Sequence, residues 1–248
     1  MSGTATKVGV FGAQGRMGTE VVAAVSNSTD MELAATVNSA DDRTTATGID
    51  VMVDFTHQDA VMENLRFAVQ HGIHAVIGTS GFDEAKLAAV RELLTASPDL
   101  GVLVAPNFAL GAVLSMRFAQ LAARYYESAE VIELHHNRKV DAPSGTAAHT
   151  ARMISSERSQ AGLSTGADAT TSEVDGARGA RIDDVHVHSV RLPGLVAHQE
   201  VLFGGAGETL TIRHDSLDRA SFMPGVLLGV RSVLQRPGLT VGLENLLE

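Results

Sequence analysis

Short apolar segments alternate with helical segments over residues 8–105, and this alternation constrains the fold more than any other feature of the chain. The segments that favour strands are 8–11, 31–37, 51–55, 74–77 and 101–105, and those with helical spacing of apolar residues are 17–25, 59–69 and 83–95. Strict alternation of this kind predicts a parallel sheet whose strands are joined by right-handed helical crossovers.

A glycine-rich turn joins the first expected strand to the first expected helix. It consists of Gly12, Ala13, Gln14, Gly15, Arg16, Met17 and Gly18. In a dinucleotide site such glycines permit a tight turn and close approach of the backbone to a pyrophosphate, which the helix N-terminus attracts. The spacing Gly-x-x-Gly-x-x-Gly departs from the commoner Gly-x-Gly-x-x-Gly, so an ordinary strand-to-helix connection is the alternative.

Residues that follow the other expected strands strengthen the nucleotide interpretation, because ligands of parallel sheets bind at the carboxyl ends of the strands. Asn38 follows the second strand, at the usual position of the residue that meets the adenosine ribose. The remaining candidates for cofactor binding are Phe55, Thr56, Gly78, Thr79, Ser80, Ala105, Pro106, Asn107 and Phe108. Each group alone suits a connecting turn, but together they predict a cofactor site.

The alternation changes after residue 109. We expect a helix over 110–126, a strand over 129–135, a helix over 145–156 and a long polar run over 157–183. Three strands in meander order (185–191, 197–203 and 208–214) and one long helix over 219–235 follow. The fold class is therefore α/β, with an N-terminal Rossmann-type domain over 1–109, completed by 218–248, and a mixed α+β substrate-binding domain over 110–217.

Residues 133–147, Glu-Leu-His-His-Asn-Arg-Lys-Val-Asp-Ala-Pro-Ser-Gly-Thr-Ala, are the candidate for chemistry. Ser144 or Thr146 can cap the following helix, whose exposed N–H groups would bind an anion, and Lys139 adds a positive charge nearby. Histidine is the side chain whose unperturbed pKa lies near neutrality, so a residue such as His135 can deliver a proton. A solvated basic loop before an ordinary capped helix is the alternative.

Composition excludes several classes of function. The net charge of −10 disfavours nucleic acid and anionic membranes as partners, and the absence of cysteine excludes disulfides and dehydrogenases with a nucleophilic thiol. No apolar run approaches the roughly 20 residues that span a bilayer, and residues 1–7 lack the pattern of a targeting signal, so we expect a cytoplasmic protein. Histidines in the later strands lack convincing ligand spacing, so we expect no metal site.

The run 133–147 closely resembles the signature of dihydrodipicolinate reductases, in which His-His, two variable residues and Lys precede Asp-Ala-Pro-Ser-Gly-Thr-Ala. The resemblance extends over nearly the whole chain and includes residues 12–18, 54–57, 78–82, 105–108 and 194–203. It implies a two-domain reductase that uses NADH or NADPH and forms a homotetramer through the sheets of the substrate domain.

The resemblance also implies roles for individual residues. His135 corresponds to the family's proton donor and Lys139 to its catalytic lysine. The residues that correspond to its substrate-binding positions are His136, Lys139, Ser144, Gly145 and Thr146. Two positions depart from the family pattern: Ser80 replaces a common threonine, and Asn38 replaces the acidic residue of many members, which leaves the preference between NADH and NADPH open.

These observations predict reduction of a small cyclic dicarboxylate, dihydrodipicolinate or its hydroxylated precursor, to tetrahydrodipicolinate in the pathway to diaminopimelate and lysine. Another imine or amino-acid dehydrogenase on the same scaffold is an alternative within enzymes. A nucleotide-sensing protein without catalysis is the alternative outside them, although a sensor has no need of His135 and Lys139 beside an anion site.

Overall fold

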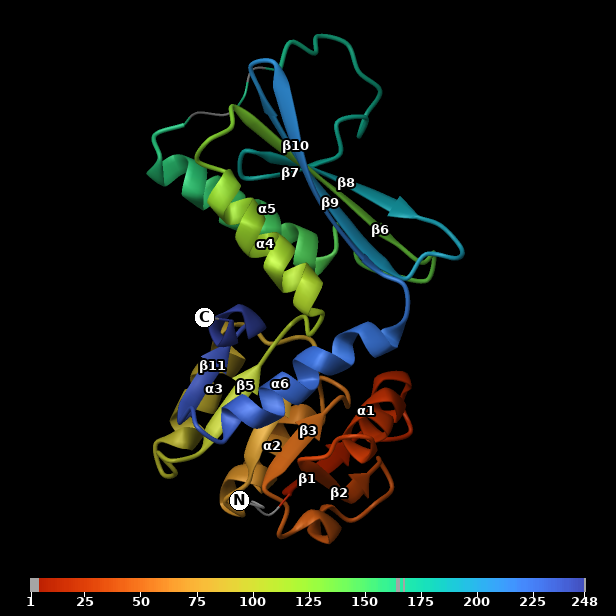
Figure 1. The fold of residues 1–248 in the computed structure, drawn as a ribbon, viewed down its shortest axis with the longest axis vertical. Coiled ribbons are helices and arrows are strands. Elements are labelled where there is room, and N and C mark those ends of the chain that lie inside the picture. Colours follow the sequence, from red (N-terminus) through yellow and green to blue (C-terminus); the bar gives the residue numbers. More distant parts are fainter. Residues whose placement is uncertain (1–4, 164–165, 167, 248) are drawn as a thin grey trace. The chain divides into compact units, whose positions relative to one another are not determined.

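The computed structural model describes residues 5–163, 166 and 168–247, and the chain divides into two compact units (Figure 1). Unit 1 contains Met1–Leu110 and Arg219–Glu248, and unit 2 contains Gly111–Asp218. Most of residues 1–7, for which we expect no targeting signal, lie outside the described part of the chain. Over the described residues, no helix is both long and apolar enough to cross a membrane.

Unit 1 is built on a six-stranded parallel sheet with the strand order β11-β5-β4-β3-β1-β2. Its strands are β1 (Thr6–Phe11), β2 (Met31–Val37), β3 (Val51–Asp54), β4 (His74–Ile77), β5 (Gly101–Val104) and β11 (Gly238–Val241). Its α-helices are α1 (Arg16–Ser26), α2 (Val61–Gln70), α3 (Glu84–Leu94) and α6 (Met223–Val233). The expected parallel sheet is confirmed.

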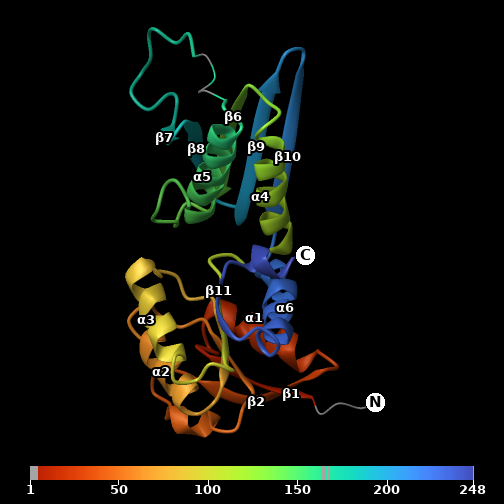
Figure 2. The same cartoon turned by 90° about the vertical axis from the view of Figure 1, so that its left-hand side faces the viewer.

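Burial explains why these segments form strands. All residues of β3 and β5 are buried, as are the last residues of β4, because helices cover both faces of the sheet. Helices α1 and α6 contact one another, α2 contacts α3, and the two pairs lie on opposite faces (Figure 2). The order of the strands reverses between β1 and β3, so the carboxyl ends of these strands form the crevice where such sheets bind ligands.

Unit 2 pairs a five-stranded mixed sheet with two helices. The strand order is β10-β9-β6-β8-β7. Its strands are β6 (Ser128–His135), β7 (Ala180–Ile182), β8 (Val185–Arg191), β9 (Ala197–Gly205) and β10 (Glu208–Ser216), and its helices are α4 (Leu110–Ala122) and α5 (Gly145–Gln160). Helices α4 and α5 lie on the same side of the sheet (Figures 1 and 2), where apolar residues of both helices pack against β6, β8 and β9.

The meander order expected for the last strands is wrong. Strand β6 lies between β8 and β9 and pairs in parallel with β8 and antiparallel with β9. Of the three strands expected to form the meander, β9 and β10 pair with each other, whereas β8 pairs with neither. A meander assumes that consecutive strands pair, whereas here Val131 of β6 provides a buried central position with Val187 and Val201 as its partners on either side.

Other boundaries also differ from the expectations. The long C-terminal helix is divided into the 3₁₀ turn η2 (Arg219–Phe222) and α6, because Pro224, which lacks an N–H, sits in the first turn of a helix and not in its interior. The tail beyond it forms β11 and the 3₁₀ turn η3 (Leu243–Leu246), and the polar segment after β2 contains η1 (Arg43–Ala46). Helix α4 ends four residues earlier than expected and α5 four residues later.

Candidate active site

The glycine turn in unit 1 has the geometry that a dinucleotide loop requires. Gly12 has a φ of +79°, in the left-handed region that favours glycine, and a Cβ atom there would lie 2.7 Å from the carbonyl oxygen of Phe55. A Cβ atom on Gly18 would lie 2.0 Å from the carbonyl oxygen of Gly12, so α1 packs on the turn more closely than a side chain allows. Helix α1 begins at Arg16, directly after the turn, and can direct its N-terminus at an anion.

A hollow of about 560 Å³ opens beside this turn, within unit 1. Of the expected cofactor residues, it is lined by Gly12, Gln14, Gly15, Asn38, Phe55 and Thr56. Asn38 uses its side chain within the protein: its Oδ1 accepts a hydrogen bond from the Gln14 N–H at 2.9 Å, and its Nδ2 donates to Asp41 at 3.0 Å. Asp41 also lines the hollow, so a carboxylate lies beside Asn38, the residue expected to meet the ribose.

The turns after β3 and β4 are held by Asp54, a fully buried carboxylate. It accepts hydrogen bonds from the hydroxyl groups of Thr56 and Thr79, both at 2.7 Å, and from the side-chain amide of Asn64 at 2.8 Å. From the sequence alone, Asp54 has no predicted role of its own. The position of Asp54 at the end of an otherwise apolar strand could have indicated a structural role, because a buried carboxylate needs several hydrogen-bond donors.

The remaining expected cofactor residues lie near these turns or at the glycine turn. The ring of Phe55 packs against Phe108, with 5.7 Å between the ring centroids, and a Cβ atom on Gly78 would lie 2.1 Å from the Phe55 ring. Asn107 accepts a hydrogen bond from the Ala109 N–H through its Oδ1. Ser80, Pro106 and Arg16 are exposed, Ala105 is buried after β5, and Ala13 and Met17 are half-buried in the glycine turn.

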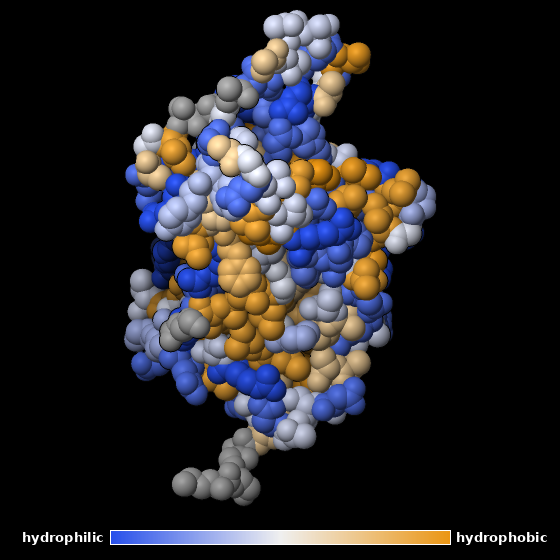
Figure 3. Space-filling view, turned by 45° about the horizontal axis from the view of Figure 1, so that its top comes forward, coloured by the Kyte–Doolittle hydropathy of each residue, from blue (hydrophilic) through white to orange (hydrophobic). Residues whose placement is uncertain are grey.

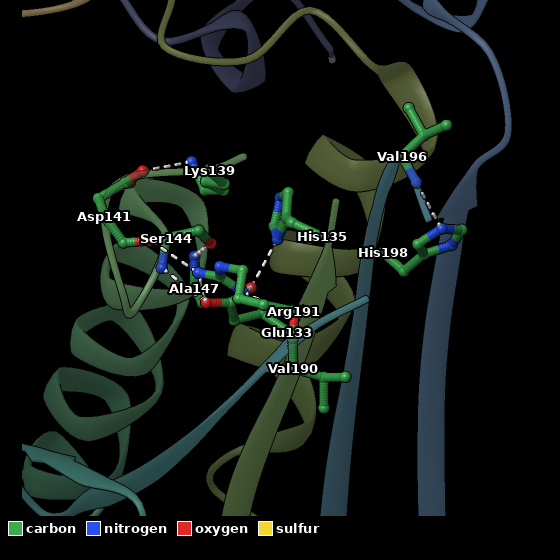
Figure 4. Close-up of polar contacts among 10 residues, drawn as sticks. All are labelled: Glu133, His135, Lys139, Asp141, Ser144, Ala147, Val190, Arg191, Val196 and His198. Atoms are coloured by element: carbon green, nitrogen blue, oxygen red, sulfur yellow. Dashed lines mark hydrogen bonds and ion pairs between the residues drawn. The ribbon is translucent and has the colours of Figure 1, made fainter. Parts of the chain in front are cut away.

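In unit 2, Ser144 caps helix α5, as expected. Its hydroxyl oxygen accepts a hydrogen bond from the Ala147 N–H at 3.2 Å. Gly145 and Thr146 form the first turn of this helix. Lys139 lies 2.7 Å from Asp141 (Figure 4). The Asp141 carboxylate also accepts a hydrogen bond from the Gly145 backbone. An acidic side chain therefore already lies at the place where the sequence predicts an anion.

His135, Ser144 and the loop before α5 converge on Glu133, which is fully buried (Figure 4). One carboxylate oxygen of Glu133 accepts a hydrogen bond from His135 Nδ1 at 2.5 Å, and the other accepts from the Ser144 N–H at 3.0 Å. Arg191 of β8 donates to both oxygens, at 2.7 Å each, and also to the carbonyl of Asp141 at 2.7 Å.

Glu133 is ionised in this environment. Burial alone would raise its pKa, but hydrogen bonds from His135, Arg191 and Ser189 outweigh burial and lower the pKa to about 2. The same contact raises the pKa of Arg191. From the sequence alone, Glu133 belongs to the 133–147 motif but has no predicted role. Strand periodicity could have indicated the contact between Glu133 and His135, because residues two apart in a strand point to the same face of the sheet.

His136, the last expected substrate contact, is half-buried directly after β6. Among the residues that the structure describes, no group of three His, Asp or Glu side chains is arranged to hold a metal ion. The structure thus brings His135, Lys139 and the N-terminus of α5 together within unit 2, and the glycine turn, Asn38 and Thr56 together within unit 1.

Comparison with protein families identifies the chain. Residues 6–108 match the model for the N-terminus of dihydrodipicolinate reductase, and residues 111–247 match the model for its C-terminus. The chain belongs to the dihydrodipicolinate reductase family. Membership makes it an oxidoreductase with a pyridine nucleotide cofactor.

Curated relatives are similar over their whole length. A 4-hydroxy-tetrahydrodipicolinate reductase of Nocardia farcinica is 63% identical over 244 residues, which cover 98% of each chain. The enzyme of the same name from Cutibacterium acnes is 63% identical over 241 residues, 97% of this chain and 98% of its own. The similarity to the family therefore extends over nearly the whole chain and is not limited to the 133–147 motif.

Solved structures agree with the family assignment. A dihydrodipicolinate reductase of Paenisporosarcina sp. TG-14 with bound dipicolinate has a TM-score of 0.86 and 39% identity, and the match covers 98% of this chain and 99% of that one. An engineered D-amino acid dehydrogenase bound to NADP⁺ has a TM-score of 0.57 and 16% identity over 99% and 96% of the two chains. The second likeness is one of fold alone.

Proposed function

We propose that this dihydrodipicolinate reductase homologue reduces 4-hydroxy-tetrahydrodipicolinate, or the dehydrated dihydrodipicolinate, to tetrahydrodipicolinate on the way to diaminopimelate and lysine. The observation that carries the proposal is the arrangement of Lys139, His135 and the N-terminus of α5 around one turn of unit 2. These groups supply a cation, a proton donor and backbone N–H groups, as reduction of an anionic ring demands. The relatives that carry this name support the substrate class.

The residues of unit 2 would share the work between binding and proton transfer. His136, Lys139, Ser144, Gly145 and Thr146 would hold the carboxylates of the ring, and the dipicolinate bound to the solved relative supports a planar cyclic dicarboxylate there. The Asp141 carboxylate already pairs with Lys139 and accepts a hydrogen bond from the Gly145 backbone. A substrate carboxylate would therefore replace the Asp141 carboxylate at these donors. The exchange keeps the charge on Lys139 compensated.

When bound, the nicotinamide cofactor would supply a hydride to a ring carbon conjugated with the imine of dihydrodipicolinate. The hydroxylated precursor would first lose water to give this ring. Negative charge then develops on the ring nitrogen and on the neighbouring carbon. Lys139 would stabilise that charge, and protonated His135 would give its proton to the carbon, which completes the reduced ring. A general acid placed in this way contributes roughly 10²- to 10⁴-fold to the rate.

Unit 1 would bind the cofactor through the glycine turn and the turns after β2 to β5. The hollow beside Gly12 and Asn38 suits the adenosine end, and the turns that Asp54 holds suit the nicotinamide end. We expect both NADH and NADPH to serve, with kcat/KM values within about tenfold of each other, or roughly 1.4 kcal/mol. We also expect a homotetramer built through the sheet of unit 2.

The direct test follows NADH oxidation by absorbance, with the cyclic substrate generated enzymatically and with open-chain keto acids plus ammonia as the comparison. We expect turnover of the cyclic compound and competitive inhibition by dipicolinate, whose two carboxylates fit the same contacts while its aromatic ring cannot accept hydride. Turnover of the open-chain acids alone would instead identify an amino-acid dehydrogenase. Nucleotide binding without turnover of either would identify a sensor.

A further inference from the structure

Glu133 joins the proton donor and the anion-binding turn through one buried carboxylate. We propose that Glu133 is a positioning residue for the reaction: it fixes the His135 imidazole with its proton on Nδ1 and, with Arg191, fixes the turn from Asp141 to Ser144. The inference rests on the proposed function, and it adds a role that neither the motif nor the family match assigns to these residues.

The hydrogen bonds determine which ring nitrogen of His135 faces away from Glu133. The Glu133 oxygen that contacts His135 Nδ1 at 2.5 Å also accepts from Arg191 at 2.7 Å. An ionised carboxylate only accepts hydrogen bonds, so Nδ1 must carry a proton. Nε2 is then an acceptor in the neutral ring and a donor in the imidazolium, and Nε2 is the atom that exchanges the catalytic proton.

The same carboxylate sets the position of the turn that binds the anion. Its second oxygen accepts from the Ser144 N–H at 3.0 Å, at the cap of α5. Arg191 extends the contact to the other end of the turn, since it donates to Glu133 and to the Asp141 carbonyl at 2.7 Å. Glu133 thus contacts both His135 and the N-terminus of α5, and its ion pair with Arg191 extends to the Asp141 end of the turn.

Burial makes this arrangement rigid. Glu133 is fully buried, and the side chains of His135 and Arg191 are only 14% and 19% exposed. A buried carboxylate without its partners is strongly disfavoured, so the donors cannot be exchanged for water at little cost. Rotation of the His135 ring, which would present the other nitrogen to the substrate, would remove the His135 donor from Glu133 and leave Arg191 and the Ser144 N–H as its partners.

Glu130, on the same strand, provides a matched control. It also pairs with an arginine and a histidine, Arg178 and His188, and the contact with His188 Nε2 is 2.7 Å. Glu130 is partly exposed, and among the described residues its side chain pairs with Arg178 and His188 rather than with the Ser144 turn. Glu130→Gln therefore removes a carboxylate from a similar cluster that takes no part in the proposed mechanism.

The experiment is ¹⁵N NMR of the full-length protein with labelled histidine, at a pH where the imidazoles are neutral, with His135→Asn to assign the signal. We expect the proton of His135 on Nδ1 in wild type and a higher fraction on Nε2 in Glu133→Gln, because the amide can donate to Nδ1. This readout does not require activity, so it is valid even where the proposed reaction fails. A wild-type ring with its proton on Nε2 would overturn the proposal, also in the case where Glu133→Gln does not fold.

Kinetics then separate positioning from a purely structural role. We expect Glu133→Gln to lower kcat about 10- to 100-fold, a part of the contribution of a positioned general acid, with a smaller change in KM. Glu130→Gln should retain wild-type kcat. Arg191→Lys weakens the ion pair but leaves Glu133 beside His135. It should therefore lower the melting temperature clearly and change kcat only slightly. Equal kcat values for Glu133→Gln and Glu130→Gln, per folded enzyme, would show that Glu133 only stabilises the fold.

Discussion

At the scale of single residues, the proposed mechanism has His135 and Lys139 act on the same developing charge of the substrate. We predict that His135→Ala and Lys139→Ala each lower kcat by roughly 10²- to 10⁴-fold and leave NADH affinity nearly unchanged, since the cofactor hollow lies in unit 1. Steady-state kinetics and NADH fluorescence titration measure the two quantities. Thr146→Val is the control and should chiefly raise the substrate KM. Near wild-type kcat in either alanine variant removes that residue from the mechanism.

We expect the preference between NADH and NADPH to depend on Asp41 as well as on Asn38. The Asp41 carboxylate lies 3.0 Å from Asn38 Nδ2, where it would repel a 2′-phosphate, while the Arg43 guanidinium already pairs with Glu63 and Asn64. We predict that Asp41→Asn raises the ratio of kcat/KM for NADPH over NADH by up to about tenfold, or roughly 1.4 kcal/mol.

The matched control for this prediction is Asp42→Asn. The Asp42 side chain caps η1 through the Thr44 N–H at 2.9 Å, and an asparagine can keep that contact. The ratio should be measured at one ionic strength, because salt screens the phosphate. An unchanged ratio in Asp41→Asn, or an equal change in Asp42→Asn, would show that Asp41 does not set the preference.

The site residues that could be predicted from sequence are those whose partners are adjacent in the chain. His135, Lys139 and Ser144 lie within one short run, so the capped helix and the nearby cation followed from spacing alone. The role of Glu133 could not be predicted in the same way, because Arg191 is 58 residues away and reaches it only through the pairing of β6 with β8. Asp41 was overlooked because it lies in a polar segment without periodicity.

At the scale of secondary structure, His74 joins two neighbouring strands of unit 1. Its Nδ1 accepts a hydrogen bond from the Gly101 N–H at 2.9 Å, which requires that nitrogen to be unprotonated. Burial lowers the pKa of His74 below 6.5, against smaller opposite effects of the Val233 carbonyl and Asp50. A group whose pKa is lower in the folded state stabilises the protein above its unfolded pKa and loses that contribution as the pH falls.

We therefore predict that acidification from about pH 7.5 to about pH 5.5 lowers the melting temperature less in His74→Asn than in wild type. Asparagine offers an acceptor near the position of Nδ1 and does not titrate. The measurement is calorimetric unfolding at several pH values, with His71→Asn, at the exposed end of α2, as the control. The same slope in wild type and His74→Asn would contradict the prediction.

The secondary structure of unit 1 could largely be predicted, because its inner strands β3, β4 and β5 are mostly buried and form short, mainly apolar runs. Strands β2 and β4 have the expected bounds. The exceptions depend on distant partners: β11 is a strand only through its pairing with β5, and β6 separates β8 from β9 only because its pairing partners come later in the chain. Local patterns do not report such pairings.

At the scale of the whole molecule, the surface bears apolar side chains in patches (Figure 3). Helices α4 and α5 cover one face of the unit 2 sheet and pack against Val131 and Val201. The half-buried side chains of Ile132 and Leu202, each one residue further along its strand, point to the opposite face. On α4, Phe118 and Leu121 are 54% and 64% exposed. Exposed apolar surface of this kind often marks an interface between subunits.

We predict a homotetramer that depends on the sheet, so Leu202→Asp should lower the sedimentation coefficient toward that of dimers or monomers. A buried charge at such an interface costs more than one at its rim. Phe118→Asp, on α4, is the comparison and should leave the assembly intact. Dissociation by Phe118→Asp alone would place the interface on α4 instead of the sheet, and a monomeric wild type would contradict the tetramer itself.

The two units should respond to different ligands, because the nucleotide contacts we propose lie in unit 1 and the dicarboxylate contacts in unit 2. A ligand that binds only the folded state stabilises it by RT ln(1 + [L]/Kd), about 2.7 kcal/mol at 100 times Kd, which corresponds to about 100-fold slower hydrogen exchange through unfolding. We predict that NADH slows exchange over residues 12–18 and 38–43, and that dipicolinate slows exchange over residues 133–150.

Hydrogen exchange with mass spectrometry of the wild-type protein, with each ligand alone, measures this division. Lys139→Ala should lose the protection by dipicolinate and keep the protection by NADH, because the variant removes a cation from the anion-binding turn of unit 2 and leaves the hollow of unit 1 intact. Asp41→Asn should keep the protection by dipicolinate. Protection of residues 12–18 by dipicolinate, or of residues 133–150 by NADH, to the same extent as by the expected ligand would show that the assignment of one ligand to each unit is wrong.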